Sequence, residues 1–225
     1  MPNATRASHK TIRAKPRKGE PAPRAYHHGA LKEALLRAAE EVLDLEGIVG
    51  LTLRETARRA GVSHAAPKNH FGDIKGLLSE LAAVGFHRLA GIMAKAVENH
   101  HDPNATMVAI GRAYVNFARR TPGLFHLMYR SESLDFSRPA LAEAIAEVSG
   151  VLRSAVISRN TAKGSTAASP LDTVASMATS WCLVHGFATL LIDNRLNPML
   201  AYVPGDDKAA VLLDAVLAKL KPPPA

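Results

Sequence analysis

The sequence predicts an all-α fold, and three observations support this prediction. The 225 residues are 47% apolar but only 5% aromatic, as in helical proteins rich in Ala and Leu. Apolar residues recur at helical spacings of three and four over long stretches. Few segments alternate with the period of two that strands show, and Val, Ile and Tyr do not cluster. A chain of this length suits one large or two small domains.

The first 25 residues form a separate, basic segment. They contain seven Lys and Arg and a single Glu, so they supply +6 of the formal net charge of +8. Large apolar residues are almost absent, so this segment cannot bury enough surface to fold alone, and we expect a disordered arm. It is either a solubilising extension or a segment that follows phosphates or lies in a DNA groove beside the folded domain.

The folded part is expected to begin near Tyr26 with an amphipathic helix. Its acidic residues lie mainly away from one apolar face. That face is expected to contain Leu31, Ala34, Leu35, Ala38, Ala39, Val42 and Leu45. Gly47 has the place of the residue just after the helix, where a left-handed backbone ends it.

Residues 52–71 predict two short helices joined by a tight turn. Thr52 is a candidate N-cap, and Glu55 three residues later would complete a capping box. Gly61 can adopt the positive φ that a tight turn requires. Ser63 is expected to cap the second helix. This is the arrangement of a helix-turn-helix.

The same segment is rich in positive charge. Four cations face a single acid, Glu55; these cations are Arg54, Arg58, Arg59 and Lys68. One reading is an ordinary corner between two helices with a solvated basic face. We favour a DNA-contacting element, because an amphipathic helix precedes the pair, an aromatic residue follows it, and the basic character peaks there.

A long helix is expected to follow, capped by Asp73 and running to about Asn99. At 1.5 Å per residue it is roughly 40 Å long and suited to transmit a remote shift. Further apolar helices follow, with prolines near their ends; they are expected at 104–120, 122–131, 138–159, 170–194 and 206–220. The sequence therefore predicts four parts: an arm (1–25), a helix-turn-helix domain (26–73), a connecting helix (74–100) and a C-terminal domain (101–221).

Residues 26–96 resemble the N-terminal domain of the tetracycline-repressor (TetR) family of transcriptional regulators. The resemblance is carried by the Leu-Leu-x-Ala-Ala helix, the run Leu-Thr-Leu-Arg-Glu-x-Ala-x-x-Ala-Gly-Val-Ser and the His-Phe closure. In the C-terminal half, Trp181, His185 and Gly186 resemble the Trp-His-Gly signature of one subgroup of TetR ligand-binding domains. The resemblance implies a homodimer whose two heads insert recognition helices into successive major grooves of a palindromic operator.

Carried onto this chain, the resemblance places the recognition helix at residues 63–70. The residues that would face bases are His64, Ala65 and Asn69. Asn can pair with adenine, Ala can contact a thymine methyl, and His can bond a purine edge. The residues that would face phosphates are Thr52, Arg54 and Lys68. The expected DNA-contacting set also includes Ser63, His70 and Lys75.

Two positions depart from the family pattern. Lys68 stands where tyrosine is usual, so a point charge replaces a rigid ring with a hydroxyl. Ile74 stands where a lysine is common early in the fourth helix, and Lys75 follows one place later, about 100° round the helix. We therefore carry over the DNA-binding role but no operator sequence.

An aromatic group in the C-terminal half predicts an effector pocket. Trp181 and His185 are four residues apart and project from one helix face. They either line an effector pocket, or they are a core Trp and an internally hydrogen-bonded His, with Gly186 permitting close helix packing. Five further residues are each candidates for the core when taken alone, but as a group they could line an apolar cavity. They are Tyr114, Phe117, Phe125, Met128 and Tyr129. We expect a small apolar or aromatic effector.

Other classes of protein are disfavoured. No nucleophile elbow, P-loop or paired-carboxylate pattern is present, so we expect no enzyme. The pairs His27-His28 and His100-His101 lack completing ligands, so we expect no metal and no cofactor. A single cysteine, Cys182, excludes an internal disulfide and favours the cytoplasm. We expect no secretory signal and no membrane span, because no uncharged, purely apolar run of about 18 residues occurs.

The sequence thus predicts a sequence-specific DNA-binding transcription regulator, most simply a repressor, released from its operator by a small-molecule effector. The alternatives are a nonspecific basic nucleic-acid-binding protein that acts through its arm and, less favoured, a small helical enzyme. The helices at 170–194 and 206–220 are expected to form the dimer interface by four-helix packing.

Overall fold

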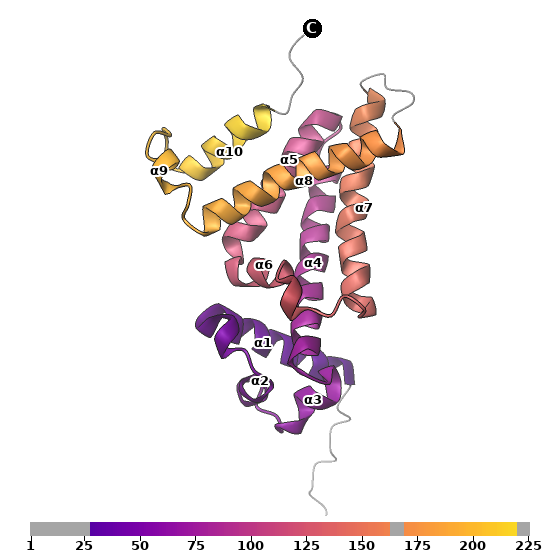
Figure 1. The fold of residues 1–225 in the computed structure, drawn as a ribbon, viewed down its shortest axis with the longest axis vertical. Helices are drawn as coiled ribbons and strands as arrows, with labels where there is room; N and C mark the ends of the chain where they lie inside the picture. The colour runs from indigo at the N-terminus through magenta and orange to yellow at the C-terminus, as the bar shows by residue number, and fades with distance from the viewer. Residues whose placement is uncertain (1–27, 163–168, 220–225) are drawn as a thin grey trace, which may run out of the picture.

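The computed structural model describes residues 28–162 and 169–219, and over these ranges the chain forms helices and no strands (Figure 1). This confirms the all-α prediction. The basic arm of residues 1–25 lies outside the described residues. The elements are α1 (His28–Gly50), α2 (Leu53–Arg59), α3 (Ala65–Phe71), α4 (Ile74–Glu98), α5 (Pro103–Arg120), α6 (Pro122–Met128), the 3₁₀ turn η1 (Ser131–Ser133), α7 (Pro139–Ala162), α8 (Pro170–Ile192), α9 (Asn197–Leu200) and α10 (Lys208–Ala218).

The molecule is elongated, with α1–α3 at one end and α5–α10 at the other (Figure 1). We call α1–α3 the head and α5–α10 the body. Helix α4 runs out of the head and packs along α7, and it also contacts α5, α6 and α1. Asp73 caps α4 as expected, because its Oδ1 accepts a hydrogen bond from the Gly76 N–H at 2.8 Å. The two ends of the molecule are therefore joined by continuous helix.

Helix α1 differs from its prediction in two places. Gly47 has the expected positive φ of 69°, but it makes a kink, and one more turn follows to Gly50. Leu45, predicted on the buried face, is 70% exposed, whereas Leu43 is only 3% exposed. The reason is that α6 covers the Leu43 side of the helix, with Gly123 close to the Leu43 side chain.

The helix-turn-helix forms with different capping from that predicted. Thr52 Oγ1 accepts the Glu55 N–H at 3.1 Å, but the Glu55 carboxylate bonds Arg58, so the capping box is only half formed. Gly61 has φ of 66°, as the turn requires. The prediction that Ser63 caps α3 is wrong. The Ser63 carbonyl, and not its hydroxyl, accepts the Ala66 N–H at 3.0 Å.

The core is continuous from head to body. Buried α4 side chains form its axis, namely Leu77, Leu78, Leu81, Phe86, Leu89 and Met93. Gly85 lets α6 approach this axis closely, because a Cβ there would lie 2.6 Å from Met128 Sδ. The helix expected at 122–131 ends earlier, at Met128, and a short helix, α9, lies between the helices expected at 170–194 and 206–220.

Within residues 28–162 and 169–219, two helices are long and apolar enough, by length and composition alone, to cross a membrane. In α4, 61% of the qualifying window is buried inside the molecule, as in the core helix of a soluble protein. In α8 only 17% is buried. Residues 174–192 contain no Lys, Arg, Asp or Glu, so the sequence reading understated the apolar length of this helix. Most of the apolar surface of α8 is therefore exposed in the part of the chain that the structure describes.

Candidate DNA-binding face and effector cavity

Helix α3 has one buried side and one exposed side. Ala66, Pro67 and Phe71 are buried against the rest of the head. Ala65, Lys68 and Asn69 are exposed. Because residues three and four apart share a helix face, these three side chains form one outward stripe.

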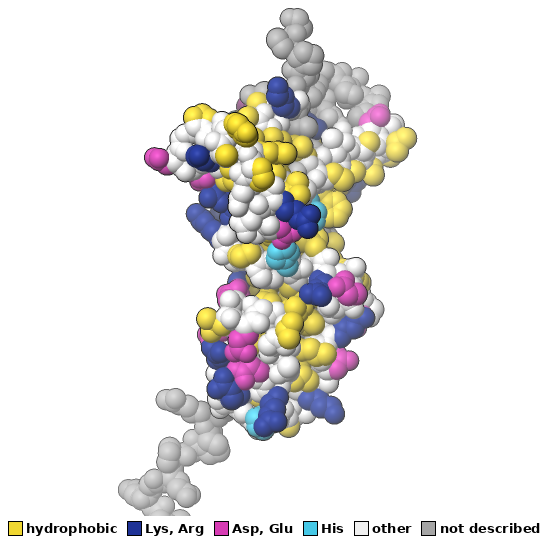
Figure 2. Space-filling view, turned by 60° about the vertical axis from the view of Figure 1, so that its left-hand side comes forward, with side chains coloured by type: hydrophobic (Ala, Val, Ile, Leu, Met, Phe, Trp, Pro, Cys, Tyr) yellow, Lys and Arg dark blue, Asp and Glu magenta, His cyan; other side chains and the backbone are white. Residues whose placement is uncertain are grey.

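The other predicted DNA-contacting residues lie around this stripe. Thr52 and Arg54, at the start of α2, and Ser63 and His64, in the turn before α3, are all exposed. Figure 2 shows Lys, Arg and His side chains gathered at the lower end of the molecule, which is the head. His70 is only half-buried, with its ring centroid 6.2 Å from that of Phe71. It therefore offers less surface than the sequence reading assumed.

Two of the arginines of α2 are paired with carboxylates. Arg58 is paired with Glu55, with Nε 2.7 Å from Oε2. Arg59 pairs with Glu46 at 3.3 Å and lies 3.9 Å from Glu55. The hydrogen bond from Arg58 lowers the pKa of Glu55, which keeps this carboxylate ionised. Arg59 therefore links α2 to α1, whereas Arg58 is paired only within α2.

Two cations of this segment have no acidic partner among the described residues. Arg54 and Lys68 form no ion pair within 4 Å among the described residues. The sequence reading set all the basic residues of the segment against Glu55 alone, and the structure leaves only this exposed pair unneutralised. Lys75 is exposed at the start of α4, but Asp135 is close enough for the two charges to interact.

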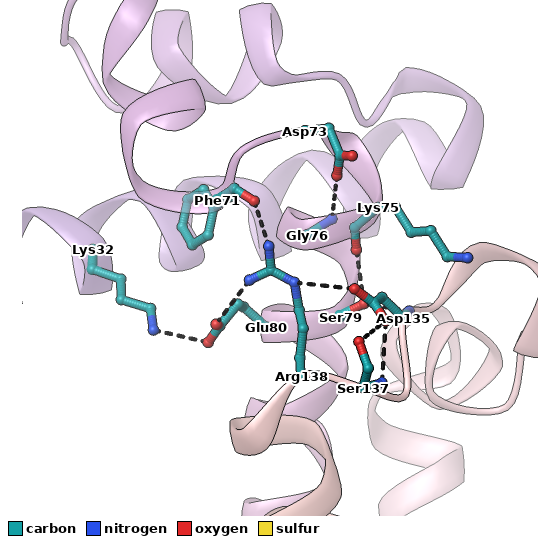
Figure 3. Close-up of polar contacts among 10 residues, drawn as sticks. All are labelled: Lys32, Phe71, Asp73, Lys75, Gly76, Ser79, Glu80, Asp135, Ser137 and Arg138. Carbon is teal, nitrogen blue, oxygen red and sulfur yellow. Dashed lines mark hydrogen bonds and ion pairs between the residues drawn. The ribbon is translucent and has the colours of Figure 1, made fainter.

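The head and the body meet at a polar junction around Arg138, just before α7 (Figure 3). Arg138 Nη2 donates to the carbonyl oxygen of Phe71, the last residue of α3, at 2.6 Å. Its Nη1 donates to Glu80 of α4 at 3.3 Å, and Lys32 of α1 lies 2.8 Å from the other Glu80 oxygen. One body side chain thus binds the end of the recognition helix.

The sequence makes room for this guanidinium at Gly76. A Cβ at this position would lie 2.4 Å from Arg138 Nη2 and 2.0 Å from the Phe71 carbonyl oxygen. A second hydrogen bond joins α4 to the segment before α7: Ser79 Oγ accepts the Asp135 N–H at 2.8 Å. Hydrogen bonds from Ser137, with smaller effects from Lys75 and Arg138, lower the pKa of Asp135. No local pattern in the sequence indicated this junction.

In the body, four ring side chains meet at one hydroxyl. Tyr114 Oη donates to Tyr129 Oη at 2.8 Å and lies 2.9 Å from His185 Nδ1. Trp181 Nε1 donates to Tyr114 Oη at 3.3 Å. We call these four residues the aromatic quartet. His185 is internally bonded, as one reading of the sequence expected, but Trp181 is 46% exposed and not a core residue.

Burial keeps the quartet uncharged. It raises the pKa of Tyr114 far above its usual value, with Tyr129 as a smaller cause, and it also raises the pKa of Tyr129. Burial lowers the pKa of His185. At neutral pH the quartet is therefore a set of neutral groups that satisfy one another's hydrogen bonds.

A cavity of about 60 Å³, the inner cavity, lies beside the quartet. Tyr114 and Trp181 line it together with residues from α4, α5, α7, α8 and α10 that the sequence reading missed, which are Met93, Asn104, Met107, Val108, Ile110, Gly111, Val148, Leu152, Arg159, Ser180, Val184 and Leu217. These residues come from five helices, so no local pattern marked them.

The structure separates the seven residues predicted to line one pocket. Phe125 and His185 border a more open groove of about 680 Å³, together with Tyr129, between α1, α6 and α8. Phe117 borders a third hollow, and Met128 is a core residue against Gly85. Only Tyr114 and Trp181 reach the inner cavity, and the quartet stands between it and the open groove.

Comparisons with known proteins identify the family. Residues 35–81 match the family described as bacterial regulatory proteins, tetR family, and residues 107–216 match the tetracyclin repressor-like C-terminal domain. The chain belongs to the TetR family. It is therefore a DNA-binding transcription regulator with an N-terminal helix-turn-helix. The C-terminal match includes Trp181, His185 and Gly186, while the Trp-His-Gly subgroup itself stays an expectation.

Several individual proteins are similar to this chain in sequence or in fold. A protein of unknown function from Rhodococcus sp. RHA1 is 34% identical, with 88% of this chain and 99% of that one covered and a TM-score of 0.68. The HTH-type transcriptional regulator YobS of Bacillus subtilis is 30% identical over 97 residues, which cover 43% of this chain and half of YobS. AibR, solved with isovaleryl coenzyme A and operator DNA, is 15% identical, with 84% and 97% covered and a TM-score of 0.58, and shares the fold.

Proposed function

We propose that this TetR-family regulator is a homodimeric repressor that binds a palindromic operator and leaves it when a small effector enters the body. The observation that carries the proposal is the outward stripe of α3, with the unpaired cations Arg54 and Lys68 beside it. A stripe with small, amide and cationic side chains suits a major groove, where base edges and phosphates lie close together.

The residues of this face divide into two roles. Ala65 and Asn69, with His64 in the preceding turn, read bases, because short and amide side chains on an exposed helix can reach the edges of base pairs. Arg54 and Lys68 bind phosphates, since no carboxylate within the described residues neutralises them. Thr52 and Ser63 support the phosphate contacts, while His70 and Lys75 lie at the margin.

A second copy of the chain covers α8. Several of its exposed residues are small or apolar and recur at helical spacing, namely Leu171, Ala175, Ala178 and Cys182, with Leu190 exposed further along the helix. Nothing lies within 4 Å of a Cβ built at Gly186, so the close packing that this glycine permits is open to a partner. Figure 2 shows further hydrophobic side chains on the upper half of the molecule. Val211 of α10 is 42% exposed.

The dimer has a direct test on the α8 face. Leu190→Asp places a charge where two apolar faces meet, so the protein should sediment as a monomer at micromolar concentration and lose operator affinity. Leu45→Asp is the matched control, because Leu45 is also exposed but lies in the head. A dimer that persists in Leu190→Asp, or a parent that is already a monomer, contradicts this interface.

Release from DNA requires a route from the body to the head. An effector in the inner cavity would move α4 and α7, which both border it and both reach the junction at Arg138. The two recognition helices would then no longer match half-sites about 34 Å apart. A coupling of about 1–3 kcal/mol is enough for such control.

Sequence-specific binding is tested with a duplex selected from a random library by the full-length protein. At about 150 mM salt, a specific regulator should prefer the selected duplex over its scrambled counterpart by roughly 10³ or more. Equal affinity for both would favour the alternative, a nonspecific nucleic-acid-binding protein that acts through its basic arm. Reporter expression from a promoter that overlaps the selected site then separates repression from activation.

A further inference from the structure

We propose that the inner cavity takes effectors that carry a carboxylate on a small apolar body, and that Arg159 binds this carboxylate. The inference rests on the proposed function, because it names the chemical class of the effector. It starts from an uncompensated cation in a cavity whose other walls are mainly apolar.

Arg159, in the last turns of α7, is the one charged side chain among the described residues that line the inner cavity. Most of the remaining wall is made by Met, Val, Leu and Ile side chains, with Asn104 and Ser180 as small polar members. An apolar wall with a single cation fits a ligand that is apolar over most of its surface and negative at one end.

Among the described residues, no carboxylate pairs with Arg159. Its Nε is buried without a hydrogen-bond partner, and it forms no ion pair within 4 Å among the described residues. Burial is the one cause that lowers the pKa of Arg159, with no nearby acid to oppose it. Residues 163–168, which follow α7, contain no Asp or Glu.

The buried Nε–H of Arg159 leaves one hydrogen-bond donor unsatisfied, which is unfavourable unless an acceptor pairs with it. Arginine stays protonated even when burial lowers its pKa, so the arrangement is not relieved by loss of a proton. A carboxylate can accept two parallel hydrogen bonds from its planar fork. The aromatic quartet does not compete for this anion, because its hydroxyl and imidazole groups already bond one another.

The size of the cavity sets the length of the first probes. A bound water needs about 10–15 Å³ of such space, so about 60 Å³ admits only a few non-hydrogen atoms before the walls move. Short acids should therefore bind first, and longer ones only if the helices separate.

The single tryptophan of the chain makes binding directly measurable. Trp181 borders the inner cavity, so its fluorescence reports on occupancy without a label. We would titrate the full-length protein with butyrate, hexanoate, octanoate and benzoate, each beside its uncharged primary amide. At least one acid should bind about tenfold more tightly than its amide, as expected for a charge-assisted bond.

Variants assign this preference to one residue. Arg159→Met should remove the advantage of the acid over the amide, and Arg159→Lys should retain part of it as a point charge. Arg153→Met is the matched control, because Arg153 is on the same helix but exposed and away from the cavity wall. It should bind acids like the parent. Circular dichroism of each variant confirms that the helices are retained.

Three results would overturn the inference: equal binding of acids and amides, an acid preference that survives in Arg159→Met, or no binding of any acid at about 10 mM. These are separate from a failure of the proposed function. If a neutral compound releases the protein from the selected duplex while the acids do not bind, the proposed function is retained and the proposed carboxylate effector is refuted. If no duplex is selected, the proposed function falls, and the fluorescence titration still decides the ligand class.

Discussion

Replacing Arg138 with Met tests whether the body holds the recognition helix in place. The substitution keeps most of the side-chain length but removes the hydrogen bond to the Phe71 carbonyl at 2.6 Å and the pair with Glu80 at 3.3 Å. The Arg138 side chain is 27% exposed and that of Glu80 13%, so neither contact is fully screened by water.

The magnitude follows from what each partner loses. A hydrogen bond from a charged donor contributes about 1.5–3 kcal/mol, and the Phe71 carbonyl has no replacement donor once Arg138 is gone. Glu80 keeps Lys32 at 2.8 Å, which limits the cost of leaving its charge buried. We expect the free energy of unfolding to fall by about 2–3 kcal/mol, or roughly 5–10 °C in Tm at fixed protein concentration.

Two assays are combined, because a loss of stability alone would not show that the recognition helix is affected. Hydrogen exchange should rise by at least about tenfold at the amides of residues 68–77, where the contacts are lost, and little in α10. Arg112→Met is the matched control. Its pair with Asp214 at 2.6 Å joins α5 to α10 on the surface, with side chains 50% and 46% exposed, so less than about 1 kcal/mol should be lost. If Arg138→Met costs no more than Arg112→Met and leaves exchange at residues 68–77 unchanged, the junction does not hold α3.

Three further predictions concern the DNA face, the quartet and the turn. Asn69→Ala should relax base preference in competition binding, whereas Lys68→Ala should weaken all duplexes alike and lower the salt slope by about one; identical loss in both would refute the division of roles. Because burial lowers the folded-state pKa of His185, stability should be full above about pH 6.5 and fall below it until the lowered pKa is passed; His185→Gln should flatten this part of a urea-denaturation pH profile. Gly61→Ala should cost about 1–2 kcal/mol from its φ of 66° alone, since nothing lies within 4 Å of the new Cβ, while Gly91→Ala, in a helix with equal space, should be neutral or stabilising.

The features that could be predicted from the sequence are those with local causes. Thr52 and Asp73 cap helices because an oxygen three residues before an N–H is within reach in any context. Gly61 and Gly47 have positive φ because the chain turns there. The exposure of Lys68 and Asn69 follows from the opposite, apolar side of α3, which is fixed by helical spacing. Each of these required only a few neighbouring residues.

The failures have tertiary causes. Leu45 and Leu43 are equally suited to burial by spacing, and the position of α6 decides between them. Phe117 and Phe125 have the composition of pocket residues, but they border other hollows, because α5 and α6 turn those rings away from the inner cavity. Ser63 has the composition of an N-cap, yet the backbone carbonyl takes the hydrogen bond. Composition indicated that an aromatic group exists, and helix packing decided which rings meet.

The two arginines that matter most in these proposals could not have been selected by pattern, and this follows from how the fold is connected. Arg138 and Arg159 stand near opposite ends of the segment that forms α7, one bound to the recognition helix and the other in the cavity wall. A helix is stiff along its axis, so a carboxylate that draws Arg159 inward would also shift the residues around Arg138. The proposed effector class and the proposed route to DNA therefore depend on the same helix, and combining Arg138→Met with the acid titration separates them. An acid that still binds Arg138→Met but no longer changes exchange at residues 68–77 would place α7 between the two sites; an unchanged response would assign the coupling to α4 alone.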